Sequence, residues 1–141
     1  VVLPQYASPQ TASSGTISTV GTIASGDSNF LVSGTSASGM NLTRGDMITI
    51  DDSSNSNHLK AYKIVRVHTS TNRLSSDSDL DSANERRYYV SPPFEKDVTS
   101  GSTVVYTNPL IRVINTKDVF EYSLGTNNLY EFSLTLEEAQ P

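Results

Sequence analysis

Apolar and polar residues alternate in short stretches along most of this chain, and the alternation is clear near the C-terminal end. In the stretch LYEFSLTL, residues 129–136, four apolar side chains share one face and three polar side chains share the other. The apolar face consists of Tyr130, Phe132, Leu134 and Leu136, and the polar face of Glu131, Ser133 and Thr135. A period of two residues is typical of a β-strand. We therefore predict a strand here with one buried and one solvated face.

A second alternating stretch, LKAYKIVRVHTS at residues 59–70, has apolar residues on both faces. One face carries Leu59, Ala61, Lys63, Val65 and Val67, and the other carries Tyr62, Ile64, Arg66 and His68. We predict a strand that packs on both faces somewhere along its length.

Turn residues separate the apolar stretches at the spacing that is typical of a β-barrel or sandwich. The predicted strands cover residues 16–24, 29–34, 46–51, 59–70, 86–91, 103–107, 110–115, 118–124 and 128–137. The turn GTNN at 125–128 separates two alternating runs and predicts a hairpin. The only helical prospect is a short turn near 80–86. The predicted fold class is all-β, a small β-barrel or β-sandwich with an extended N-terminal arm.

The arm is predicted because the first 15 residues lack the alternating pattern. The segment VVLPQYASPQTASSG has two prolines and few apolar residues after Leu3, which is typical of an extended segment. The predicted organisation is an arm at 1–15 and a single β domain at 16–141. This start lacks the basic residues and apolar core of a signal peptide, and no apolar run approaches the roughly 20 residues of a membrane helix.

The composition narrows the function classes. Ser, Thr and Asn make up a third of the chain, which favours turns and strand ends over helices. The net charge of -5 and the pI near 4.8 argue against a nucleic-acid partner, because that binding comes largely from Lys and Arg. The chain has no cysteine, which excludes a disulfide-stapled module and a thiolate metal site.

Acidic residues in the longest polar insertion, residues 71–85, raise the question of a cation site. Asp77, Asp79 and Asp81 alternate as at the start of a calcium loop, since hard cations take several oxygen ligands. The motif then departs, with Ser82 where the loop needs Gly and Tyr88 where it needs a bidentate Glu. We favour a solvated acidic loop over a calcium loop, and predict no metal ligand.

A second polar turn can likewise be interpreted as a cation site or as a solvated loop, and we again favour the solvated loop. Its oxygen-bearing residues are Asp51, Asp52, Asn55 and Asn57.

His58 and His68 are the only histidines. A catalytic triad or a zinc site needs a His held by an orienting carboxylate, and the sequence ties neither His to a nucleophile. We therefore predict no enzymatic activity, no catalytic or cofactor-binding residue and no cofactor. The seven tyrosines, which include Tyr88 and Tyr89, suit a carbohydrate-binding platform or the strands and interfaces of an assembly. Because the chain has no Trp, we favour the second use.

The stretch NLTRGDMITI, residues 41–50, contains two further motifs. Asn41-Leu42-Thr43 fits a glycosylation acceptor, and Arg44-Gly45-Asp46 is a tripeptide that adhesion receptors recognise. No signal peptide supports a secretory route. We predict instead that Gly45 permits a tight turn, that Asp46 hydrogen-bonds backbone in this turn, and that Ile48 and Ile50 enter the core.

Five stretches between residues 15 and 109 form one pattern when taken in order: GTISTVGTIASGDSNFLVSG, LTRGDMITI, AYKIVRVHT, YYVSPPF and TVVYTNP. Together they resemble a small β module of structural proteins in tailed bacteriophage virions. The positions that carry the resemblance are Gly15, Thr16, Ile17, Leu42, Gly45, Asp46, Ile48, Ile50, Ile64, Val65, Val67, Val90, Pro93 and Phe94. The insertion at 71–85 and the polar turn DDSSNSNH depart from the module.

The resemblance implies a non-enzymatic building block of the virion, most directly a tail, baseplate or neck component. Its partners would be other virion structural proteins and further copies of itself, joined into a ring by strand and arm contacts. It would be located in the virion, after assembly in the host bacterial cytoplasm, without nucleic-acid or membrane contact. Two alternatives stay open: a capsid decoration protein, and an adhesive or carbohydrate-binding β module.

Overall fold

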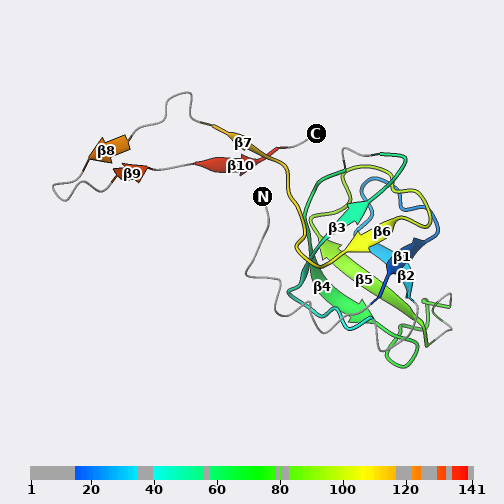
Figure 1. Cartoon of the computed structure of the whole chain (residues 1–141). Coiled ribbons are helices and arrows are strands. Elements are labelled where there is room, and N and C mark those ends of the chain that lie inside the picture. The colour runs from blue at the N-terminus through cyan, green and yellow to red at the C-terminus, as the bar shows by residue number, and fades with distance from the viewer. Residues whose placement is uncertain are drawn as a thin grey trace.

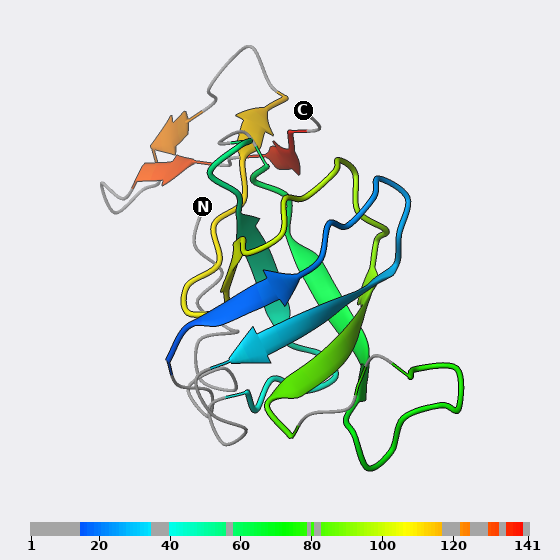
Figure 2. The ribbon, with the colours of Figure 1, turned by 90° about the vertical axis from the view of Figure 1, so that its right-hand side faces the viewer.

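The computed structural model describes residues 15–34, 40–55, 58–78, 80, 83–116, 122–124, 130–132 and 135–139. In this part of the chain the regular structure is all β, and six antiparallel strands close into a barrel, as Figure 1 and Figure 2 show. The predicted all-β class is confirmed. Of the two predicted architectures, the barrel is the one that forms.

The order of strands around the barrel is β1-β2-β5-β4-β3-β6, and β6 closes the barrel against β1. The strands are β1 (Ile17–Val20), β2 (Asn29–Gly34), β3 (Met47–Asp51), β4 (Tyr62–His68), β5 (Glu85–Ser91) and β6 (Thr103–Val105). Each lies largely within a predicted range, because the alternation that identifies a strand is a local property of the sequence.

The inward-facing residues fill the barrel with one apolar core. Phe94 joins two other rings of this core, with its ring edge-on to Phe30 at 5.3 Å and beside the Tyr62 ring at 4.6 Å. The residues of this core are Ile17, Ile23, Phe30, Val32, Met40, Leu42, Ile48, Ile50, Tyr62, Ile64, Tyr88, Val90, Phe94, Val98 and Val104.

A β-bulge in β4 explains why this strand has apolar residues on both faces. The register with β5 shifts between Ile64 and Arg66, and such an extra residue changes which side chains face inward. Val65 is exposed at the bulge, whereas Val67 packs against the core. The next residue, His68, is also buried. The strand therefore packs on both faces at its end, as predicted.

Four short strands outside the barrel form two antiparallel pairs, which we call the C-terminal ribbon. β7 (Val113–Asn115) pairs with β10 (Leu136–Glu138), and β8 (Tyr122–Leu124) pairs with β9 (Tyr130–Phe132). Figure 1 shows the ribbon extending away from the barrel. The hairpin predicted across the GTNN turn is confirmed by the pairing of β8 with β9.

The single strand predicted at 128–137 is wrong, because β9 ends at Phe132 and β10 begins at Leu136. The prediction that its apolar face is buried is also wrong at Leu136, whose side chain is 40% exposed. The β7–β10 pair has only two strands, and among the described residues no second layer covers Leu136. The burial predicted for Tyr130, Phe132 and Leu134 concerns side chains outside the described part.

Two further predictions concern the β4–β5 loop and the N-terminal arm. The helical turn predicted near 80–86 is wrong, because Glu85 and Arg86 already belong to β5. Figure 2 shows the preceding loop projecting from one end of the barrel. The predicted arm at 1–15 lies outside the described residues apart from Gly15. No helix in the described ranges is long and apolar enough to cross a membrane.

Candidate functional site

The turn before β3 places Asp46 inside the protein. The Thr43 amide donates to Asp46 Oδ2 at 2.8 Å, and the Asp46 amide donates to the Thr43 carbonyl at 3.2 Å. Between them, Gly45 has a φ of 107°, a conformation that favours glycine. Ile48 and Ile50 are buried in the core. The predicted turn is confirmed, and the Asp46 side chain of the Arg44-Gly45-Asp46 tripeptide is buried.

The β4–β5 loop is held to the barrel by a second buried carboxylate. Asp77 Oδ2 lies 2.8 Å from His68 Nδ1 and also accepts from the Leu74 amide at 3.3 Å, while Asp77 Oδ1 lies 3.5 Å from Arg87 Nε. The His68 hydrogen bond is the main cause that lowers the pKa of Asp77 below its ordinary value. The predicted solvated acidic loop is therefore wrong at Asp77.

The calcium interpretation gains nothing from this arrangement. The Asp77 carboxylate is taken up by donors of the protein itself, and Tyr88 is fully buried in the barrel. Asp79, Asp81 and Ser82 lie outside the described part. In the ranges that the structure describes, no group of three His, Asp or Glu side chains is placed to hold a metal ion.

Sequence reasoning missed that His68 is held by a carboxylate. His68 also lies against Tyr89, with ring centroids 4.9 Å apart and the Tyr89 hydroxyl 3.4 Å from Nδ1. Among the hydrogen bonds of the described residues, none joins His68 to a serine or threonine hydroxyl. The contacts therefore make His68 an anchor for the loop. A polar insertion after a histidine was the only signal in the sequence.

His58, the other histidine, is part of the core. Its Nε2 lies 2.6 Å from the Tyr62 hydroxyl, which also accepts from the Glu95 amide at 3.4 Å. Burial lowers the pKa of His58, and burial raises the pKa of Tyr62 to about 12. Both groups are neutral near pH 7, so the Tyr62 hydroxyl can donate to Nε2, whereas His58 Nδ1 has no hydrogen-bond partner among the described residues. This contact stabilises the core.

Asp52 organises the second polar turn. The amides of Ser54 and Thr99 donate to its two carboxylate oxygens at 2.9 and 3.0 Å. Burial would raise the pKa of Asp52, but these backbone hydrogen bonds outweigh that effect and lower it. Asp51 is exposed, and Asn57 lies outside the described residues. Asp52 thus ties this turn to the loop before β6, and the described contacts do not gather oxygens around a cation.

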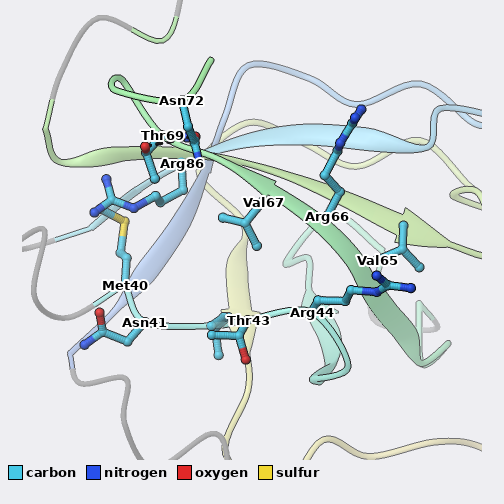
Figure 3. A pocket seen from close by; sticks show the side chains of 11 residues that line it. Met40, Asn41, Thr43, Arg44, Val65, Arg66, Val67, Thr69, Asn72 and Arg86 are labelled. Carbon is cyan, nitrogen blue, oxygen red and sulfur yellow. Dashed lines mark hydrogen bonds between the residues drawn. The ribbon is translucent and has the colours of Figure 1, made fainter. Parts of the chain in front are cut away.

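A groove of about 820 Å³ lies between segment 40–44 and the second half of β4. Figure 3 shows Val67 pointing into its middle, with Arg44 and Arg86 toward opposite ends. Arg66 is the third arginine that lines the groove, and no acidic residue belongs to its described lining. The sequence does not reveal this groove, because its three arginines come from distant segments.

The base of the C-terminal ribbon is fixed to the barrel by Glu138. Its Oε2 lies 3.2 Å from Lys60 Nζ, and its Oε1 accepts from the Ala61 amide at 3.2 Å. Lys60 is only 7% exposed, so this ion pair is largely shielded from water. The Arg112 amide adds a hydrogen bond to the Leu59 carbonyl at 3.3 Å. These contacts therefore fix the position at which the ribbon leaves the barrel.

No protein-family model matches the chain, and no curated protein matches its sequence. The fold and contacts define a class of architecture: an antiparallel β-barrel with an external two-stranded ribbon and an arginine-lined groove.

Proposed function

We propose that this chain is a non-enzymatic structural subunit of a tailed-bacteriophage virion. It acts most directly as a tail, baseplate or neck component that assembles into an oligomeric ring. The observation that carries the proposal is the C-terminal ribbon, which extends from a closed barrel (Figure 1). The module that the barrel sequence resembles gives the setting.

The ribbon has the properties of a surface that a neighbouring subunit covers. A two-stranded sheet is marginally stable alone in water, and this one exposes Ile114 by 52% and Leu136 by 40%. Within the described structure each pair consists of two strands, and no third strand pairs with either of them. Open edges can form main-chain hydrogen bonds with another chain. A neighbouring subunit would cover the apolar residues and satisfy these edges together.

The fixed base of the ribbon supports assembly with a repeated geometry. A ring needs the same angle between every subunit and the next. Glu138 contacts both the side chain of Lys60 and the backbone of Ala61, and these contacts restrict how the ribbon leaves the barrel.

The contacts of the two histidines also support a structural role. His58 is engaged by Tyr62 inside the barrel, and His68 is engaged by Asp77 under a loop. These are the side chains that would most readily carry acid or base chemistry. Here each one stabilises the fold.

Native mass spectrometry and electron microscopy of the full chain test the proposal. We expect a discrete oligomer with ring-shaped images, and we expect Leu136→Asp to shift the mass toward the monomer. Val20→Asp is the matched control, because Val20 is also 40% exposed but lies on the barrel. A monomer at every concentration would contradict the proposal, as would specific glycan binding by a monomeric chain.

A further inference from the structure

The groove contains an open edge of the barrel. β3 pairs with β4 as far as Lys63, and the turn before β3 extends this contact to Ile64, whose amide donates to the Asp46 carbonyl and whose carbonyl accepts from the Gly45 amide, both at 2.8 Å. Beyond this point, Arg66 to His68 pair with β5 alone among the strands of the described structure. On the side of β4 that faces away from β5, segment 40–44 does not join the sheet. The groove lies between segment 40–44 and β4.

Val67 presents its backbone to this groove. It lies opposite Tyr88 of β5. The Val90 amide points to the side of β5 that faces away from β4, where it donates to the Ser28 carbonyl at 2.8 Å. Since hydrogen-bonding groups alternate sides along a strand, the amide and carbonyl of Tyr88 also point away from β4. The pair of Val67 and Tyr88 is therefore one that exchanges no hydrogen bonds, and the backbone groups of Val67 point into the groove.

The charge of the groove is opposite to that of the chain. Arg44, Arg66 and Arg86 line it, in a protein with a net charge of -5. Arg86 is held in place by hydrogen bonds to the carbonyls of Ala83 and Glu85, both 2.7 Å. A groove with an open strand edge and three cations suits an extended acidic segment, because main-chain pairing and charge attraction act together.

The chain itself contains an acidic segment that includes paired strands. Residues 111–138, which include the C-terminal ribbon, carry five acidic and two basic side chains, a net charge of -3. Residues 1–14 carry no charged side chain, so charge does not favour them as the occupant. Figure 1 shows the ribbon extending away from its own barrel. The ribbon that fills the groove would then belong to a second copy.

We propose that the groove between segment 40–44 and β4 binds the C-terminal ribbon of a neighbouring copy, with an edge strand of the ribbon added beside Val67. The contact is head-to-tail, because the donor surface and the receptor surface are different parts of the chain. Repetition of such a contact gives a ring when the rotation closes. This inference rests on the proposed function and assigns the contact through which the subunits join.

Charge reversal in the full chain tests the assignment. The double variant Arg44→Glu, Arg66→Glu should weaken self-association by roughly tenfold or more, measured by sedimentation equilibrium, because like charges then oppose the ribbon. Lys63→Glu is the control for charge, since Lys63 is exposed on β4 but does not line the groove. Adding Glu131→Lys and Glu137→Lys to the double variant should restore association. Unfolding midpoints establish that every variant is folded.

The outcomes distinguish a failure of this inference from a failure of the proposed function. Loss with the double variant and recovery with the four-residue swap support the ribbon as occupant. Loss without recovery overturns that occupant, and equal association of the double variant and Lys63→Glu overturns the groove as the receptor. In both cases self-association of the unaltered chain leaves the proposed function standing. An unaltered chain that never self-associates overturns both.

Discussion

Three buried aspartates hold turns or loops of this protein by accepting hydrogen bonds from backbone amides. Asp46 accepts from Thr43, Asp52 from Ser54 and Thr99, and Asp77 from Leu74. The role of Asp46 could be predicted because its partner lies three residues away beside a glycine. The pairing of Asp77 with His68 could not, because it depends on how a long polar loop returns over the end of β4.

Replacing Asp46 tests the turn that the sequence predicted. Asp46→Ala leaves the Thr43 amide without its carboxylate partner and should lower the free energy of unfolding by about 1 to 2 kcal/mol. Urea unfolding with an unchanged slope measures this difference. Asp51→Ala is the control, since Asp51 is exposed at the end of β3. Equal stability of the two variants would show that the turn does not depend on the carboxylate.

The lowered pKa of Asp77 predicts how the β4–β5 loop responds to acid. The ordinary pKa is 3.8, and hydrogen bonding to His68 lowers it in the folded state. The stabilisation is therefore fully present above pH 3.8 and is lost as the pH falls through the lower folded value. Amide hydrogen exchange at Leu80, whose amide donates to the Asp77 carbonyl, should become faster over that range, after correction for intrinsic rates.

The matching variant is Asp77→Asn, in which this acid dependence should disappear and exchange at Leu80 should be fast throughout. Asp27→Asn provides the comparison, because Asp27 accepts a local backbone hydrogen bond in a separate turn. If Asp77→Asn retained the acid response of the unaltered chain, a different group would control the loop.

At the scale of elements, local alternation was enough to find the strands of the barrel but not their surroundings. Ile48 and Ile50 enter the core as their spacing predicted. The bulge in β4 was not predictable, because it depends on the register with β5. Burial at Leu136 was overestimated for a related reason: alternation indicates a strand, but the number of layers around it decides exposure.

The base of the ribbon gives a prediction at the same scale. Glu138→Ala removes the acceptor of the Ala61 amide and one carboxylate partner of the buried Lys60. Hydrogen exchange at Ala61 should become roughly tenfold faster, as expected for the loss of one charge-assisted hydrogen bond. Glu137→Ala alters the neighbouring residue of the same strand, which is exposed, and should leave this rate unchanged. Equal effects of the two variants would contradict the clamp.

At the scale of the whole molecule, a closed barrel and an open ribbon divide two tasks. The barrel buries the apolar core and hides most strand edges, so few of its edges are open to a neighbour. The ribbon leaves apolar side chains and strand edges exposed, which suits a contact between subunits. The sequence predicted the hairpin of the ribbon, but not the arginine-lined groove that we assign as its receptor.

The most direct test of the proposed function is the place of the chain in a particle. Electron microscopy of tailed particles labelled with an antibody against the full chain should show label at the tail, baseplate or neck, in the small copy number of a ring. Label spread over the shell would contradict this position and favour a decoration protein. Particles without label, from a lysate in which the chain is abundant, would contradict the role as a virion subunit.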